Sequence, residues 1–154
     1  MQARIGIVTI SDTRTSADDR SGPAARQALS AVGFENFETR LVKDEVEEIR
    51  AVILELCESC VAVFTTGGTG FSRRDVTPEA TAPLLDRRAD SLSELMRLRG
   101  LERTPLSHLS RGISGVRGNT LIVNLPGSPK GAEQGIEAIA HLLDPILEAL
   151  NPSS

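Results

Sequence analysis

Short apolar runs rich in β-branched residues alternate along this chain with stretches of helical periodicity. Ile5–Ile10 (IGIVTI) and Val61–Thr65 (VAVFT) are typical of strands that are buried on both faces. Helical patterns follow them, and Phe37–Val42 forms a further strand-like run. Such alternation favours βαβ units with right-handed crossovers. The sequence therefore predicts one domain over residues 1–154, a three-layer α/β/α fold around a mostly parallel sheet.

An antiparallel piece is expected near the end of the chain. Gly118-Asn119 separates Ile113–Arg117 from Thr120–Leu125, and this dipeptide suits the tight turn of a β-hairpin. We expect the hairpin at one edge of the sheet. A short helix is expected to begin at Thr104-Pro105, and a long last helix from about Pro129.

Residues that commonly cap helices precede three of the helical patterns. Ser21 or Gly22 is the expected N-cap of the first helix, and Pro23 suits its first position. Asp44, with Glu47 three residues later, resembles a capping box. A further helix is expected to begin with Thr77 as its N-cap and Pro78 at its first position.

Composition excludes several classes of function. The 17 basic and 21 acidic residues give a net charge of −4, and only 3% of residues are aromatic. Nucleic-acid binding requires a basic face or stacking aromatic rings, so no nucleic-acid partner is expected. No apolar run approaches the roughly 20 residues of a membrane span. Residues 1–20 do not resemble a signal peptide, so we expect a cytoplasmic protein without a membrane partner.

The two cysteines, Cys57 and Cys60, form a CxxC motif. A zinc site needs further ligands, and His108 and His141 are too far away in the sequence for finger-like spacing. Redox-active CxxC motifs lie at helix N-termini, whereas this one follows a helical pattern. We interpret both residues as structural thiols.

Three loops are expected to meet beyond the carboxyl ends of the parallel strands, where ligands bind in such folds. They are Ser11–Gly22, Thr65–Thr77 and Asn124–Gly131. Gly67–Gly70 (GGTG) could bring backbone N–H groups close to a phosphate, although an ordinary strand-to-helix turn is the alternative. Asp75 could bind Mg²⁺ beside that turn or form an ion pair with Arg73 or Arg74.

These motifs together resemble the molybdopterin adenylyltransferase family of the MogA/MoaB type, which is similar to the G domains of gephyrin and of the plant molybdenum insertase. The matching strings are IVTISDT at 7–13, DRSGP at 19–23, VKDEVEEI at 42–49, TTGGTGFSRRDVTPEAT at 65–81 and LSRGISGVRGNTLIVNLPGSPK at 109–130. They span nearly the whole chain in the same order.

The resemblance implies an enzyme that transfers AMP from ATP to molybdopterin, with Mg²⁺, in a MogA/MoaB-like fold that usually forms a homotrimer. It implies that Asp44 and Asp75 are catalytic and metal-binding, so Asp44 is a candidate both for catalysis and for capping. It also implies a substrate-binding set: Ser11, Asp12, Ser21, Gly22, Thr66, Gly67, Gly68, Thr69, Gly70, Ser110, Asn124, Pro126, Gly127 and Ser128. A molybdenum-insertion protein would receive the product.

Two alternatives stay open from the sequence. One is a catalytically silent pterin-binding or scaffold protein of the same fold. The other, less favoured, is a CinA-type pyrophosphatase that acts on a dinucleotide without pterin. The sequence does not distinguish a molybdenum pathway from a tungsten pathway.

Overall fold

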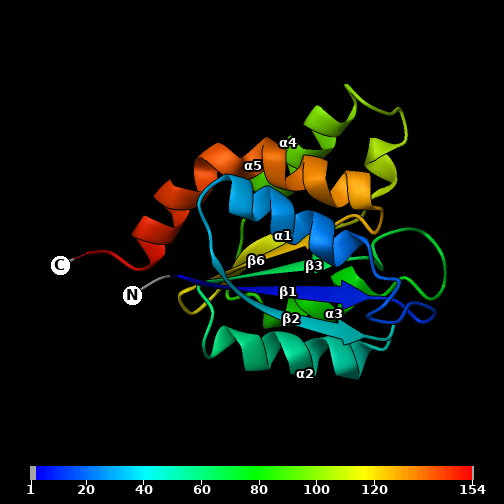
Figure 1. Cartoon of the computed structure of the whole chain (residues 1–154), viewed down its shortest axis with the longest axis horizontal. Coiled ribbons are helices and arrows are strands. Elements are labelled where there is room, and N and C mark those ends of the chain that lie inside the picture. The colour runs from blue at the N-terminus through cyan, green and yellow to red at the C-terminus, as the bar shows by residue number, and fades with distance from the viewer. Residues whose placement is uncertain (1–2, 154) are drawn as a thin grey trace.

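The computed structural model describes residues 3–153, which form a six-stranded sheet with helices on both faces (Figure 1). The strand order is β2-β1-β3-β6-β5-β4. The strands are β1 (Arg4–Ile10), β2 (Asn36–Val42), β3 (Ala62–Thr66), β4 (Arg87–Arg88), β5 (Ser114–Arg117) and β6 (Thr120–Leu125). The helices are α1 (Ser21–Ala31), α2 (Val46–Cys57), α3 (Thr77–Thr81), α4 (Asp90–Gly100) and α5 (Pro129–Leu150), with short 3-10 turns η1 (Ala82–Leu84) and η2 (Ser107–Leu109).

The expected three layers and mostly parallel sheet are confirmed. Helices α1, α4 and α5 cover one face of the sheet, and α2 and α3 cover the other (Figure 1). Alternate residues of β3 supply the two cores: Phe64 faces the α1/α5 side, whereas Val63 faces the α2 side. A strand with both faces buried must be apolar throughout, which explains the continuous runs seen in the sequence.

The late antiparallel hairpin is confirmed, and it lies at one end of the sheet but one strand in from the edge. β6 pairs in parallel with β3, so it belongs to the central parallel set, and β5 runs antiparallel beside it. The edge is β4, a two-residue strand that the sequence pattern did not indicate because it is too short to show alternation. Gly118 adopts φ +58°, which the turn between β5 and β6 requires.

One expectation about the helices is wrong, whereas the long last helix from Pro129 is confirmed. No helix begins at Thr104-Pro105: residues 101–103 and 105–106 form turns, and only the 3-10 turn η2 follows. The proline therefore begins a turn instead of a helix, a role that it serves equally well. α5 continues through Pro145 to Leu150.

The three expected N-caps do not cap their helices. The N-cap positions are Arg20, Glu45 and Val76, and none of them makes a side-chain capping bond. Pro23 and Pro78 are accordingly the third and second residues of their helices. By contrast, Ser128 caps α5, and its Oγ accepts a hydrogen bond from Gly131 N at 2.9 Å. Among the described residues, no helix is long and apolar enough to cross a membrane.

Candidate functional site

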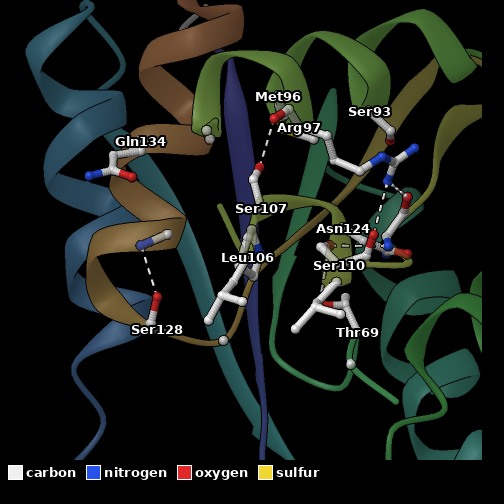
Figure 2. Close-up of a pocket in the computed structure, with 18 of the residues that line it drawn as sticks. Thr69, Ser93, Met96, Arg97, Leu106, Ser107, Ser110, Asn124, Ser128 and Gln134 are labelled. Atoms are coloured by element: carbon white, nitrogen blue, oxygen red, sulfur yellow. Dashed lines mark hydrogen bonds between the residues drawn. The ribbon is translucent and has the colours of Figure 1, made fainter. Parts of the chain in front are cut away.

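A pocket of about 410 Å³ lies beyond the carboxyl ends of β3 and β6 (Figure 2). It is enclosed by α4, the start of α5 and residues 67–70 (GGTG), called the glycine turn below. Ser128 and Gln134 lie on its α5 side, and Thr69, Ser110 and Asn124 on the opposite side (Figure 2). Its volume falls in the range of small-molecule sites. The pocket is therefore at the place where open α/β sheets bind ligands.

The glycine turn forms one wall, and its backbone conformation requires glycine. Gly67 and Gly68 adopt φ +96° and +70°. A methyl group on Gly67 would lie 2.3 Å from the carbonyl oxygen of Ile10, and one on Gly68 would lie 2.1 Å from Thr77 Oγ1. Gly127 packs against the same turn, because a methyl group placed on it would lie 3.1 Å from Gly67 Cα. The second and third of the three expected loops therefore meet here.

Asp44 and Asp75 both lie against this turn, Asp44 beside Gly68 and Asp75 beside Gly70. A methyl group placed on Gly68 would lie 3.1 Å from Asp44 Oδ1, and one on Gly70 would lie 2.8 Å from Asp75 Oδ2. Asp75 lines the pocket, whereas Asp44 lies behind Gly68 and outside the lining. The fold therefore brings together two carboxylates that are 31 positions apart in the sequence.

Asp44 carries an unfavourable charge. It does not cap α2, because Glu45 is the N-cap residue. Burial raises the pKa of its carboxyl above the usual value, and the negative charges of Asp12 and Asp75 act in the same direction. A carboxylate that is partly desolvated beside like charges is a candidate functional group, since a cation would relieve its repulsion.

The Asp75 carboxylate is held by a backbone hydrogen bond within its own loop and not by an arginine side chain. Its Oδ2 accepts a hydrogen bond from Ser72 N at 3.0 Å, which closes a small loop. The alternative of an ion pair with Arg73 or Arg74 is wrong: among the described residues Asp75 forms neither pair, and Arg74 instead binds Asp12 (Nε to Oδ2, 2.7 Å) and Glu45. This contact with Arg74 holds the pKa of Asp12 below its usual range. Asp12 also accepts a hydrogen bond from Asp44 N at 3.0 Å, so it connects the first loop to Asp44.

Asn124 lies at the floor of the pocket with its amide fully engaged. Its Nδ2 donates to Thr65 Oγ1 at 3.0 Å and to Thr81 Oγ1 at 3.2 Å, and its Oδ1 accepts from Ile113 N at 3.2 Å. Ser110 also lines the pocket, and its Oγ contacts Thr69 Oγ1 at 3.5 Å. The side chain of Asn124 therefore holds neighbouring segments together at the pocket floor.

The sequence-predicted residues divide into two groups. The pocket lining includes Gly68, Thr69, Gly70, Asp75, Ser110, Asn124, Pro126, Gly127 and Ser128. The others lie outside it: Ser11, Asp12, Ser21, Gly22, Asp44, Thr66 and Gly67.

Members of the second group support the turn from behind or make local contacts. Ser21 Oγ is 3.0 Å from Thr66 Oγ1, which anchors the start of α1 to the end of β3. Gly22 N donates to Asp19 Oδ1, so Asp19 takes over part of the capping expected of Ser21. Ser11 Oγ accepts from two backbone N–H groups of its own loop.

One wall of the pocket was missed by sequence reasoning. Met96 and Arg97 of α4, and Leu106, Ser107 and Leu109 after it, line the pocket. Leu106 and Leu109 are 63% and 53% exposed, so this wall presents apolar surface at the pocket mouth. The sequence signal that could have found this wall is the group of leucines at 101–109, a segment without helical periodicity whose apolar side chains do not pack into the core.

Arg97 keeps this wall in place. Its Nη1 donates to the carbonyl oxygens of Gly112 at 2.9 Å and Ser110 at 3.3 Å. The carbonyl oxygen of Arg97 accepts from Ser107 Oγ at 2.7 Å (Figure 2). The segment after α4 is thereby folded back onto the pocket.

The donor set suits a cation that takes most of its ligands from elsewhere. In the described part of the chain, no group of three or more His, Cys, Asp or Glu side chains could hold a metal ion. Asp44 and Asp75 supply two carboxylates beside a pocket with room for anionic ligands. Mg²⁺ binds in this way, through one or two carboxylates with substrate phosphates and water. The residues therefore fit Mg²⁺ better than a metal that needs a full protein cage.

The cysteines lie away from the pocket. Cys57 ends α2 and Cys60 is buried just before β3, and both are free thiols. Burial raises the pKa of the Cys57 thiol to about 11 and also raises that of Cys60. These thiols are protonated at neutral pH, which agrees with a structural role.

Comparison with known proteins gives a consistent result. Residues 6–148 match the family described as the probable molybdopterin binding domain. The chain is 42% identical to the molybdopterin adenylyltransferase of Escherichia coli K12, over 88% of this chain and 73% of that protein. It is 41% identical to the Drosophila melanogaster molybdenum cofactor synthesis protein cinnamon over 90% of this chain, but the match spans only 24% of that longer protein.

A solved structure extends the agreement to three dimensions. The molybdopterin biosynthesis enzyme MoaB of Thermus thermophilus superposes with a TM-score of 0.90 at 44% identity, and the match covers 99% of this chain and 98% of that one.

Proposed function

Because the chain belongs to the probable molybdopterin binding domain family, we propose that it is a molybdopterin adenylyltransferase. It transfers AMP from ATP to the terminal phosphate of molybdopterin and releases pyrophosphate, a step of molybdenum cofactor biosynthesis. The single observation that carries this proposal is the pocket itself. The glycine turn, with positive φ angles and with Asp44 and Asp75 beside it, lines one wall of the cavity. The loop Asn124–Gly131 lines another part of the same cavity.

The pocket provides surfaces for both reactants. Backbone N–H groups in the glycine turn and at the N-terminus of α5 are suited to bind the anionic phosphates of the two substrates. We assign the glycine turn to the pterin side and the segment 124–128 to the nucleotide side. The exposed leucines at the mouth, Leu106 and Leu109, offer apolar contact to a planar ring.

The reaction is a substitution at the α-phosphorus of ATP. An oxygen of the pterin's terminal phosphate forms a new P–O bond there, and the bond to pyrophosphate breaks, with its electron pair leaving on the pyrophosphate oxygen. Both reactants are anions, so the protein must align them and offset their repulsion. The glycine turn, held in one conformation by its contacts with Ile10 and Thr77, contributes that alignment.

Asp75 and Asp44 would hold Mg²⁺, which supplies charge neutralisation on the phosphates when it is bound. Asp75 contributes its carboxylate from the pocket wall, and its contact with Ser72 N fixes the orientation of that carboxylate. The raised pKa of Asp44 is the electrostatic reason to expect a cation there.

Single-turnover transfer is the direct test. Purified protein, molybdopterin and ATP are mixed with and without Mg²⁺, and adenylylated pterin and pyrophosphate are measured. Product that depends on Mg²⁺ supports the proposal, and Asp75→Asn should then bind pterin but lose turnover. Tight pterin binding without product would favour a catalytically silent scaffold, and absence of pterin binding would refute the assignment.

The setting follows from the same proposal. We propose that the protein acts in the cytoplasm, assembles as a homotrimer, and passes its product to a molybdenum-insertion protein. Sedimentation of the purified protein tests the trimer independently of the activity.

A further inference from the structure

The loop that carries Asp75 is largely exposed, and apart from the ion pairs of Arg74 with Asp12 and Glu45 it has little side-chain packing of its own. Residues 71–74 are exposed between Gly70 and Asp75, and Phe71 is 73% exposed. Such a loop samples several conformations unless other segments restrain it. The position of the Asp75 carboxylate therefore depends on contacts that come from elsewhere in the chain.

Arg111 provides these contacts from outside the pocket. Its Nε donates to the carbonyl oxygen of Gly70 at 2.8 Å, and its Nη2 donates to that of Asp75 at 2.9 Å. Its own backbone N donates to the carbonyl oxygen of Thr69, also at 2.8 Å. One residue thus holds the loop at both ends, although it is absent from the pocket lining.

The guanidinium is itself fixed in place. Its Nη1 lies 2.6 Å from Glu79 Oε2 on α3, and the Arg111 side chain is only 29% exposed. The ring of Phe71 lies 5.8 Å from its Cζ, so the exposed phenyl group of the loop also contacts the cation. Arginine suits this position because its planar fork presents several N–H donors in a fixed arrangement.

We infer that Arg111 is a positioning residue for the proposed transfer reaction. It holds the loop from Thr69 to Asp75 so that the glycine turn and the Asp75 carboxylate face the pocket. The inference rests on the proposed function. Arg111 touches neither reactant: it acts through the loop, and its loss displaces Asp75. A displacement of about 1 Å can reduce turnover on the order of a hundredfold.

The chain offers a matched control in Arg50. It also donates to two backbone carbonyls, those of Ala80 at 3.1 Å and Glu79 at 3.2 Å, and its side chain is 32% exposed. It holds α3, including the main chain of Glu79, and makes no hydrogen bond or ion pair with the described residues 69 to 75. Arg50→Lys therefore reproduces the loss of an arginine-to-carbonyl contact without releasing Asp75.

The experiment compares Arg111→Lys with Arg50→Lys and wild type. We expect Arg111→Lys to lower kcat roughly tenfold to a hundredfold, with the KM for molybdopterin unchanged and a higher Mg²⁺ concentration needed for half-maximal rate. Arg50→Lys should match wild type. Hydrogen exchange of the ligand-free proteins should be faster over residues 69–76 in Arg111→Lys alone. Equal kcat in the two variants, or unchanged exchange in the loop, would overturn the inference.

Glu79→Gln keeps the inference testable if Arg111→Lys does not fold. Glutamine retains an acceptor for Arg111 but removes the ion pair, so a smaller fall in kcat with unchanged KM is expected. A change in KM alone would contradict a positioning role. If the wild type itself forms no adenylylated pterin, the proposed function fails, and the exchange comparison still decides whether Arg111 holds the loop.

Discussion

Asn124→Ala is expected to lower stability strongly, although Asn124 is one of the residues that the family resemblance placed in the substrate site. Its amide makes three hydrogen bonds inside the protein, to Thr65, Thr81 and Ile113, and the residue is 1% exposed. These bonds connect the ends of β3 and β6 with α3 and with Ile113, the residue just before β5. Its contribution to the site is therefore structural support.

The size of the effect follows from what each partner retains. Thr81 still donates to the carbonyl oxygen of Thr77, and the hydroxyl of Thr65 can rotate. The N–H of Ile113 loses its acceptor outright. Three bonds contribute about 1 kcal/mol each, and the half-buried N–H adds about 1 kcal/mol, the low end of the usual penalty. The expected loss is about 4 kcal/mol, or roughly 10 °C in Tm for a chain of this size.

Urea denaturation at neutral pH measures this loss, with Asn119→Ala as the control. Asn119 is an exposed residue in the turn between β5 and β6, so its replacement should change the free energy of unfolding by less than about 0.5 kcal/mol. Thr65→Val, which removes one of the three bonds, should cost about 1 kcal/mol. The reasoning is refuted if Asn124→Ala and Asn119→Ala unfold at the same urea concentration.

Three further outcomes are expected. The folded protein raises the pKa of the Asp44 carboxyl, so the ionised carboxylate destabilises the fold above that pKa. Asp44→Asn should therefore unfold at a higher urea concentration than wild type at pH 7 and at the same concentration at pH 3. The same variant should lose transfer activity. Gly67→Ala should prevent folding or lower Tm far more than Gly118→Ala, which meets no neighbour and costs about 1 kcal/mol; calorimetry compares the two. Cys57 should react with a thiol reagent at pH 8 much more slowly than free cysteine, since its pKa is about 11; rapid labelling would contradict its burial.

Hydrophobic periodicity predicted most of the fold because it reports burial directly. Runs such as Ile5–Ile10 are apolar throughout because helices cover both faces of the strand. The same signal says nothing about β4, which has two exposed residues, or about the wall after α4, which forms through Arg97 and its contacts with distant carbonyls. Contacts of this kind join residues far apart in sequence and leave no local period.

The wrong N-caps show where local rules give way to the site. Each expected cap makes its contact with the glycine turn or its strand instead of with its own helix: Ser21 Oγ meets Thr66 Oγ1, Thr77 Oγ1 donates to the carbonyl oxygen of Gly67 at 2.9 Å, and Asp44 lies against Gly68. Ser128, whose Oγ bonds within its own helix, does cap. A helix without a side-chain cap lacks about 1 kcal/mol of stabilisation, and among the described residues only at α1 does a neighbouring side chain, that of Asp19, supply part of it. Ser21, Thr77 and Asp44 all contact the glycine turn or its strand, so these side chains stabilise the turn and not the N-termini of their helices. Departures from local preference that converge on one place are what a functional site produces.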